Sequence, residues 1–288
     1  MADILFIHNN FPAQFGFLAR ALVAAGHRCA AIASGTGTAV EGVHLVRWGS
    51  KRSNTPDLLP AATRIEADLI RGAAAARAAE HLRAEGFSPA LIIGHPGWGE
   101  TIYMREIFPA ARQIAYAEYY YRGVGGDVGF DPEFSPARTT DGHELYAKNA
   151  GMALAFAEAQ AIVAPTAFQQ SLLPETFRLR SEVIHEGVDT ATVKRHPAPR
   201  LTLASGKTIT PGTPVVTFIN RRFEPLRGFH IFARALPALL EAVPDAEVVV
   251  SARTSRAATA RRRGRARPGA ENSSPRSRAG STARASTS

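Results

Sequence analysis

The sequence predicts an α/β protein built on a parallel sheet, and two observations carry this prediction. Short apolar runs alternate with amphipathic, Ala-rich stretches through the first 185 residues, which is the rhythm of successive βαβ units. The same rhythm restarts at residue 214, after a Pro-containing stretch of low apolar content. We therefore expect a first domain over residues 1–185, a linker over 186–213 and the beginning of a second α/β domain over 214–250.

The elements of the first domain follow from periodicity and from turn residues. Runs of apolar residues bounded by turn signals predict buried strands at 3–8, 28–33, 42–48, 90–94, 112–116, 161–164 and 181–185. Apolar residues at helical spacing predict helices at 14–25, 64–85, 141–159 and from 167 onward. Gly26 and Gly86 follow the first two helices as helix-ending glycines do, and Thr166 precedes the last helix as an N-cap.

The second domain is predicted to contain a strand at 214–220, the loop RRFEPLRG, a helix at 229–243 and a strand at 246–250. From Ser251 onward no Val, Ile, Leu, Met, Phe, Tyr, Trp or Cys occurs. The sequence thus predicts a second domain that has only begun, followed by a disordered Arg-rich tail over 251–288.

The net charge of +9 belongs to this tail. Residues 251–288 contain ten Arg and one acid, Glu271, so residues 1–250 balance 24 basic against 24 acidic side chains. The neutral folded part gives no sign of a specific nucleic-acid partner, and the tail lacks the aromatic side chains that stack on bases. We expect from it at most a weak attraction to polyanions and to membrane surfaces.

Two further features bear on the cellular setting. The single Cys29 excludes an internal disulfide and fits a reducing compartment. The N-terminal apolar run is too short for a signal peptide, and no later apolar run is long enough to span a membrane. A cytoplasmic protein is the expectation.

Candidate site residues follow the strands at the carboxyl edge of the predicted sheet, where ligands of open α/β sheets gather. His95, in GHPGWGE, could exchange a proton with a substrate hydroxyl, or simply bond loop carbonyls. Glu118, Tyr119 and Tyr120 could hold a sugar by hydrogen bonds and stacking, or form a half-buried aromatic loop. Gly16 could open a helix N-terminus to a phosphate, or serve only a tight turn.

A second group of candidates belongs to the loop of the second domain. Arg221, Arg222 and Arg227 precede a helix, where guanidinium groups suit a diphosphate. A solvated loop with scattered charge is the alternative. No His or Cys residues have metal-ligand spacing, and the turn HNNFPAQFG lacks the GxGxxG of a nicotinamide-type site.

Several of these stretches together resemble a family 4 glycosyltransferase of the GT-B type. The resemblance is carried by HNNFPAQFGFLARALVAAGH, LIIGHPGWGE, IVAPTAFQQSL, VIHEGVDT and FINRRFEPLRGFHIFARALPALLEAVPDAEVVV. It implies two Rossmann-like domains, and retaining transfer of a sugar from a nucleotide sugar to an acceptor hydroxyl of a glycan or lipid-linked acceptor. It further implies no metal and no other cofactor, because positive charge and helix dipoles stabilise the leaving diphosphate.

The resemblance also assigns roles to single residues. Gly16 would lie near the donor phosphate, and His95 would face the acceptor and the reacting carbon. Arg222 and Arg227 have the five-residue separation of the family's phosphate-binding pair, with Arg221 as the alternative to Arg222.

The chain departs from the family after Val250. The family continues with a Gly-rich turn and most of the donor domain, including two Glu, separated by seven intervening residues, that hold the donor. The tail has no such segment, so we interpret it as the product of a shifted reading frame that truncates the donor domain. A basic arm and a natural extension are the alternatives.

Two functions follow. The first is a glycosyltransferase whose activity in this form is in doubt, and the second is a catalytically silent protein that binds an acceptor or a partner. Binding of a nucleotide sugar would separate them.

Overall fold

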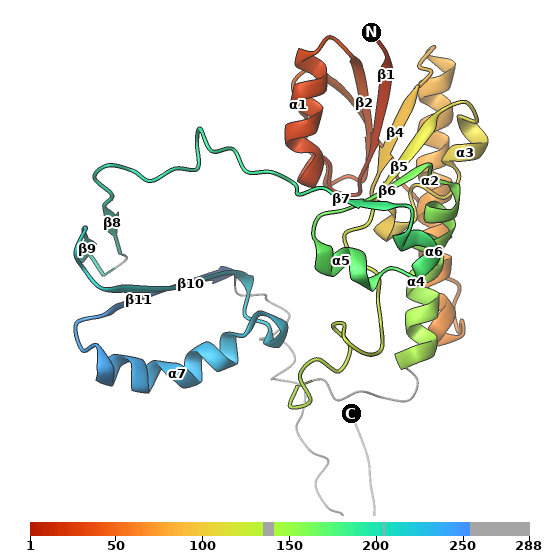
Figure 1. Cartoon of the computed structure of the whole chain (residues 1–288). Coiled ribbons are helices and arrows are strands. Elements are labelled where there is room, and N and C mark those ends of the chain that lie inside the picture. The colour runs from red at the N-terminus through yellow and green to blue at the C-terminus, as the bar shows by residue number, and fades with distance from the viewer. Residues whose placement is uncertain (135–140, 204, 254–288) are drawn as a thin grey trace, which may run out of the picture. The chain divides into compact units, whose positions relative to one another are not determined.

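The computed structural model describes residues 1–134, 141–203 and 205–253 of the chain. The chain divides into two compact units, of which the first comprises Met1–Arg200 and the second begins at Leu201 (Figure 1). This boundary falls inside the stretch predicted as a linker, residues 186–213.

A seven-stranded parallel sheet forms the centre of the first unit. Its strands are β1 (Asp3–Ile7), β2 (Arg28–Ala33), β3 (Val43–Arg47), β4 (Leu91–Gly94), β5 (Arg112–Tyr116), β6 (Ala161–Ala164) and β7 (Ser181–Val183). They lie in the order β3-β2-β1-β4-β5-β6-β7, and every neighbouring pair is parallel. The direction in which the sheet grows therefore reverses between β1 and β4, and open α/β sheets bind their ligands outside the carboxyl ends of the strands at such a point.

Six helices among the described residues connect these strands. They are α1 (Gly16–Ala24), α2 (Thr63–Ala84), α3 (Met104–Ile107), α4 (Asp141–Glu158), α5 (Ala167–Leu172) and α6 (Glu175–Arg178), with 3-10 turns at Ala13–Phe15, Pro60–Ala62 and Pro96–Trp98. Four of the six, α1, α2, α4 and α5, lie where the sequence predicts a helix. Gly26 follows α1 at φ +83°, a left-handed conformation that costs glycine little. Thr166 caps α5 by accepting from the backbone N–H of Gln169 at 3.2 Å.

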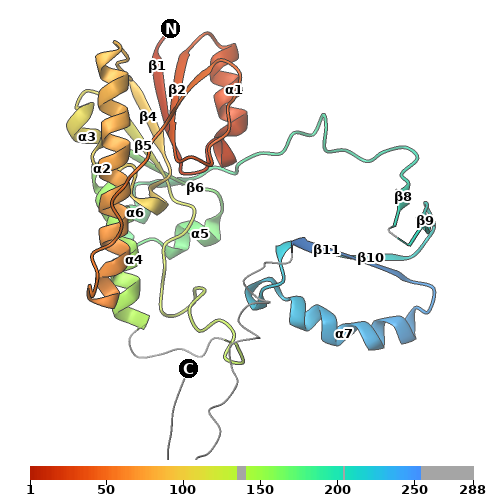
Figure 2. The same cartoon turned by 180° about the vertical axis from the view of Figure 1, so that it is seen from behind.

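The sheet buries apolar side chains on both faces. On one face Leu5 and Ile7 pack against Ala, Leu and Met side chains of α2 and α3. On the other face Phe6 and Ala31 pack against Phe15 and α1, and Figures 1 and 2 show α1 and α2 on opposite sides of the strands. Because both faces are covered, the strands read as continuous apolar runs and not as alternating ones.

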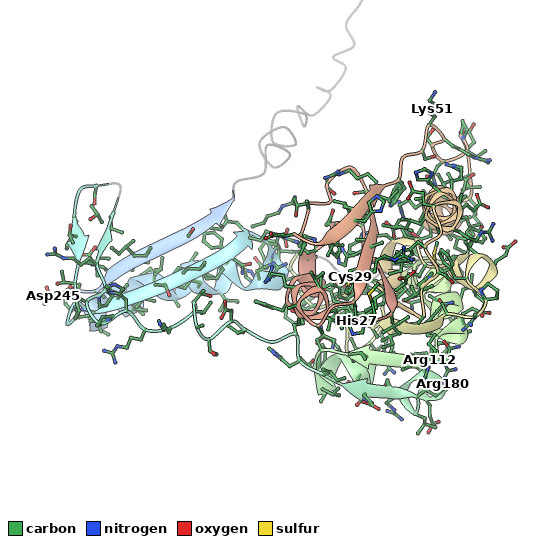
Figure 3. All side chains as sticks on the ribbon, turned by 90° about the horizontal axis from the view of Figure 1, so that it is seen from above. His27, Cys29, Lys51, Arg112, Arg180 and Asp245 are labelled. Carbon is green, nitrogen blue, oxygen red and sulfur yellow. The ribbon has the colours of Figure 1, made fainter. Side chains whose placement is uncertain are left out.

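Cys29 lies inside β2 on the face that α1 covers (Figure 3). It is buried, and burial raises the pKa of its thiol. A thiol in this setting is a packing residue, as the sequence predicts. None of the described helices combines the length and the apolar run that a bilayer crossing requires.

The second unit is smaller. Its described part consists of an antiparallel pair β8 (Leu201–Thr202) and β9 (Thr208–Ile209), a parallel pair β10 (Val215–Arg222) and β11 (Glu247–Arg253), the helix α7 (Phe229–Ala242) and a 3-10 turn at Pro225–Arg227. Phe218 of β10 stacks on Phe232 of α7, with ring centroids 4.9 Å apart. This β10–α7–β11 unit is the βαβ unit that the sequence predicts for the second domain.

Two boundaries in the second unit differ from the prediction. The stretch expected to be a plain linker contains the β8–β9 pair, which turns at Gly206 with φ +86°. The strand expected to end at Val250 continues to Arg253, and Ser251 pairs in register with Ile219. Backbone pairing does not need apolar side chains, so the loss of apolar residues after Val250 does not mark the end of the strand. The remainder of the predicted tail, 254–288, lies outside the described residues.

Candidate functional site

Two buried histidines lie where the sheet reverses direction. His95 directly follows β4, and His8 directly follows β1. Their rings meet edge to face with centroids 5.0 Å apart. The sequence analysis singled out His95 and missed His8, although His8 ends a buried strand at the same sheet edge and could have been found by that criterion.

Hydrogen bonds to both ring nitrogens fix the orientation of His95. The backbone N–H of Gly97 donates to Nδ1 at 3.1 Å, and Nε2 lies 2.9 Å from Oε2 of Glu118. Because Nδ1 accepts, the ring proton is on Nε2 and points at the Glu118 carboxylate. The alternative of a histidine that bonds only loop carbonyls does not account for this contact between His95 and Glu118.

Glu118 accepts a second hydrogen bond that leads back to His8. Nε2 of Gln14 donates to Oε1 of Glu118 at 3.1 Å, and Oε1 of Gln14 lies 2.9 Å from Nε2 of His8. The backbone N–H of Asn10 donates to Nδ1 of His8 at 2.9 Å, so the proton of this ring also is on Nε2. A continuous chain of hydrogen bonds thus connects the ends of β1, β4 and β5.

The charges of this network follow from burial and pairing. The hydrogen bond from His95 is the largest cause that lowers the pKa of Glu118, so this carboxylate is ionised at neutral pH. Burial, and after it the charge of His95, lowers the pKa of His8 to about 4. The side chain of Glu118 is 44% exposed and that of His95 only 6%, so Glu118 is the member of the pair that solvent or a substrate can reach.

Aromatic rings enclose the two histidines. The ring of Trp98 lies 4.5 Å from that of His95 and 5.1 Å from that of His8, and Tyr116 lies 5.7 Å from His95. The hydroxyl of Tyr116 donates to the carboxylate of Glu186, just beyond β7. Burial, then this hydrogen bond, raises the pKa of Tyr116. The surrounding aromatic rings bury His95, and its hydrogen bonds are stronger in this environment of low polarity.

The three tyrosines after Glu118 form a half-buried run. Tyr120 packs on the core between β5, β6 and α4, with its ring 6.4 Å from that of Phe156. Its packing matches the alternative of a half-buried aromatic loop. Tyr119 is half-buried, and its ring lies 5.1 Å from that of Tyr121. Asn149 of α4 holds this run by bonding both the backbone N–H and the carbonyl of Tyr121.

Gly16 is buried and begins α1 with a helical φ of −60°. A Cβ added there would lie 3.6 Å from Cβ of Pro12 and 3.8 Å from a guanidinium nitrogen of Arg20, which are ordinary contacts. Neither the backbone angle nor the packing therefore requires glycine, so the tight-turn alternative does not explain this residue. The N-terminus of α1 has no side-chain cap, and the backbone N–H of Gly16 donates to the carbonyl of Ala13 in the preceding 3-10 turn.

The predicted phosphate-binding arginines belong to the second unit. Arg221 and Arg222 are the last two residues of β10, whereas the sequence analysis placed them in the loop that follows. Arg227 is the last residue of the 3-10 turn before α7. Arg222 and Arg227 both approach Glu224, at 4.0 Å and 3.4 Å. The sequence analysis overlooked this acid, which reduces the local positive charge to two. The side chains remain 56% and 40% exposed.

Taken by itself, neither unit brings three His, Cys, Asp or Glu ligand atoms into one metal-sized cluster among its described residues.

The sequence matches the model of a protein family described as the glycosyl transferase family 4 group over residues 25–193, more than half of the chain. The chain belongs to this family. The matched stretch includes His95, Glu118, Tyr119 and Tyr120, whereas Gly16 and the three arginines lie outside it. No curated protein matches the sequence.

Several solved structures have a similar fold. The catalytic domain of starch synthase IV from Arabidopsis thaliana, bound to ADP and acarbose, is 15% identical, with 88% of this chain and 68% of that chain covered and a TM-score of 0.54. Less similar are the S. aureus MnaA–UDP co-structure (12% identity, 90% and 64% covered, TM-score 0.48) and Arabidopsis thaliana UGT89C1 complexed with UDP-L-rhamnose (10%, 88% and 69%, 0.48). This chain spans about two thirds of the length of these structures.

Proposed function

We propose that this protein transfers a sugar from a nucleotide sugar to a hydroxyl of a glycan or lipid-linked acceptor, with retention of configuration. Family membership supports the reaction class. The observation that supports the site is the contact between His95 and Glu118 at the end of β4, beside the strand where the sheet reverses direction.

In this proposal Glu118 meets the acceptor. Its carboxylate is ionised at neutral pH and half exposed, so it can accept a hydrogen bond from a sugar hydroxyl. His95 holds the carboxylate from its buried side and orients it, and Tyr119 offers an aromatic face to the CH groups of a sugar ring. His95 itself would touch the reacting groups only after its Nε2–H leaves Glu118.

The donor side of the proposal uses Arg222 and Arg227 of the second unit. Guanidinium groups stabilise a diphosphate leaving group by charge and hydrogen bonds. We propose that they take the part that a metal ion takes in other transferases. UDP and ADP are the probes of choice, because the similar structures are bound to these nucleotides.

Calorimetric titration of the full chain with UDP and with ADP tests the proposal. We expect one of them to bind, and we expect the double variant Arg222→Ala, Arg227→Ala to weaken binding by about tenfold or more. Arg52→Ala is the matched control, because it removes an exposed arginine of the first unit that touches no proposed donor residue. If neither nucleotide binds to the wild-type chain, the alternative of a catalytically silent binding protein replaces this proposal.

A further inference from the structure

A buried carboxylate lies on the helix behind the His95 loop. Asp68 of α2 is 2% exposed, and two arginines of the same helix surround it. Nε of Arg64 lies 3.0 Å from its carboxylate, and a terminal nitrogen of Arg71 lies 2.5 Å from it. A carboxylate this deeply buried requires such partners.

Both arginines extend from Asp68 to the loop that follows β4. Nε of Arg71 donates to the carbonyl of Trp98 at 2.7 Å, and Arg64 donates to the carbonyl of Gly97. Each guanidinium group therefore binds the carboxylate with one nitrogen and the loop backbone with another. Lysine, with a single nitrogen, could not make both contacts with the same geometry.

The loop residues held in this way are the ones that define the state of His95. The N–H of Gly97 donates to Nδ1 of His95, and the Trp98 ring packs on the imidazole. If Gly97 moved, Nδ1 would lose its donor, and the ring proton could occupy either nitrogen.

Close packing leaves the carboxylate little room to move. A Cβ on Gly99 would lie 2.3 Å from the backbone oxygen of Asp68, and one on Gly151 of α4 would lie 3.0 Å from Oδ2 of Asp68. The loop thus approaches the backbone of Asp68 where only glycine fits, and a side chain at position 151 of α4 would press on the carboxylate itself. The position of the carboxylate and the position of the loop are coupled.

We propose that Asp68 is a positioning residue for His95. Through Arg64 and Arg71 it fixes the carbonyls of Gly97 and Trp98, and so keeps the proton of His95 on Nε2, facing Glu118. The inference rests on the proposed role of His95 and Glu118 in the site, but its test does not depend on activity.

The test observes the imidazole directly. We label the full chain with 15N-histidine, assign the His95 signals by their loss in His95→Asn, and record them over a pH series. Wild type is expected to show an acceptor signal at Nδ1 and a protonated signal at Nε2. In Asp68→Asn both signals should move toward the average of the two tautomers.

A matched control and a second variant separate positioning from general stability. Asp3→Asn removes a carboxylate that also binds an arginine, Arg28, but at the opposite edge of the sheet, and it should leave the His95 signals unchanged. Arg64→Lys serves if Asp68→Asn does not fold, because it retains the charge on a side chain that is 34% exposed. We expect it to shift the His95 signals in the same direction.

Wild-type His95 signals in both folded variants, with only a lowered unfolding temperature, would overturn the inference. Failure of UDP and ADP to bind would leave this result unaffected, so the two proposals can fail independently.

Discussion

The burial of His8 makes the stability of the fold depend on pH. His8 is 2% exposed, and burial lowers its pKa from the ordinary 6.5 to about 4. Between these values the unfolded chain binds a proton that the folded chain does not, so stability is lost as pH falls from 6.5 to 4. The loss amounts to about 3 kcal/mol for this group. In His8→Gln we expect the free energy of unfolding to change less steeply between pH 4 and 6.5, by the equivalent of about one proton. Urea unfolding over this pH range measures the slope.

Glu100, five residues after His95, makes stability depend on pH in the opposite direction. It is fully buried, and neither carboxylate oxygen has a hydrogen-bond partner outside its own residue among the described residues. Burial raises its pKa from 4.5 to about 7. Between these values the folded chain binds the extra proton, so stability falls as pH rises from 4.5 to 7, by about 3 kcal/mol in total.

We expect Glu100→Gln to abolish this loss, so that the variant is more stable than wild type at pH 8 and similar to it at pH 4. Urea unfolding at the two pH values measures the difference. His8→Gln is the control, because it should change only the acid side. Equal stability of Glu100→Gln and wild type at pH 8 would show that the carboxylate is not desolvated.

The sequence indicated which edge of the sheet carries the site, because His95 and Glu118 follow predicted strands. It could not tell that His95 and Glu118 touch, since they are 23 residues apart and meet only when β4 and β5 pair. It also could not tell that Tyr120 turns toward α4, because the direction of a side chain in an irregular loop has no sequence period. Gln14, which links His8 to Glu118, appeared only as a helix residue.

Among the elements, the contact between α2 and the loop after β4 is the tightest backbone approach near the site. Gly99 has φ +94°, and a Cβ there would lie 2.3 Å from the backbone oxygen of Asp68. We expect Gly99→Ala to destabilise the fold by about 3 kcal/mol or more, because it combines left-handed strain with a clash that only a backbone shift can relieve. Thermal and urea unfolding measure the loss.

Gly86→Ala isolates the first of these two causes. Gly86 follows α2 at φ +81°, and a Cβ there would meet nothing within 4 Å. Its substitution should therefore cost only about 1 kcal/mol, the strain alone. Similar losses for the two variants would contradict the packing explanation.

The elements that the sequence predicted well are those with a strong period or a firm stop. β2, β5 and β6 have the predicted bounds, and Gly26 and Gly86 follow their helices as expected. The missed helices α3 and α6 have only four residues each, too few to show a period. The β8–β9 pair has two residues per strand and was hidden in a stretch defined by its prolines.

At the scale of the whole molecule, the two units differ in how much they bury. The first has apolar clusters on both faces of its sheet. In the described part of the second, Ile209 is the single buried apolar residue, and no residue of β10 or α7 is buried. A βαβ unit that buries so few of its apolar side chains gains little hydrophobic stabilisation to offset the entropy lost on folding.

Amide hydrogen exchange of the full chain tests this difference. We expect amides of β10 and β11, such as those of Val216 and Val249, to exchange at least about 100-fold faster than those of Leu5 and Ile92 in β1 and β4, because local opening needs to expose little apolar area in the second unit. Saturating UDP or ADP should slow exchange in the β10–β11 pair if Arg222 and Arg227 bind the nucleotide, since a ligand stabilises the state that it binds. Equal protection of the four strands without nucleotide would contradict this expectation.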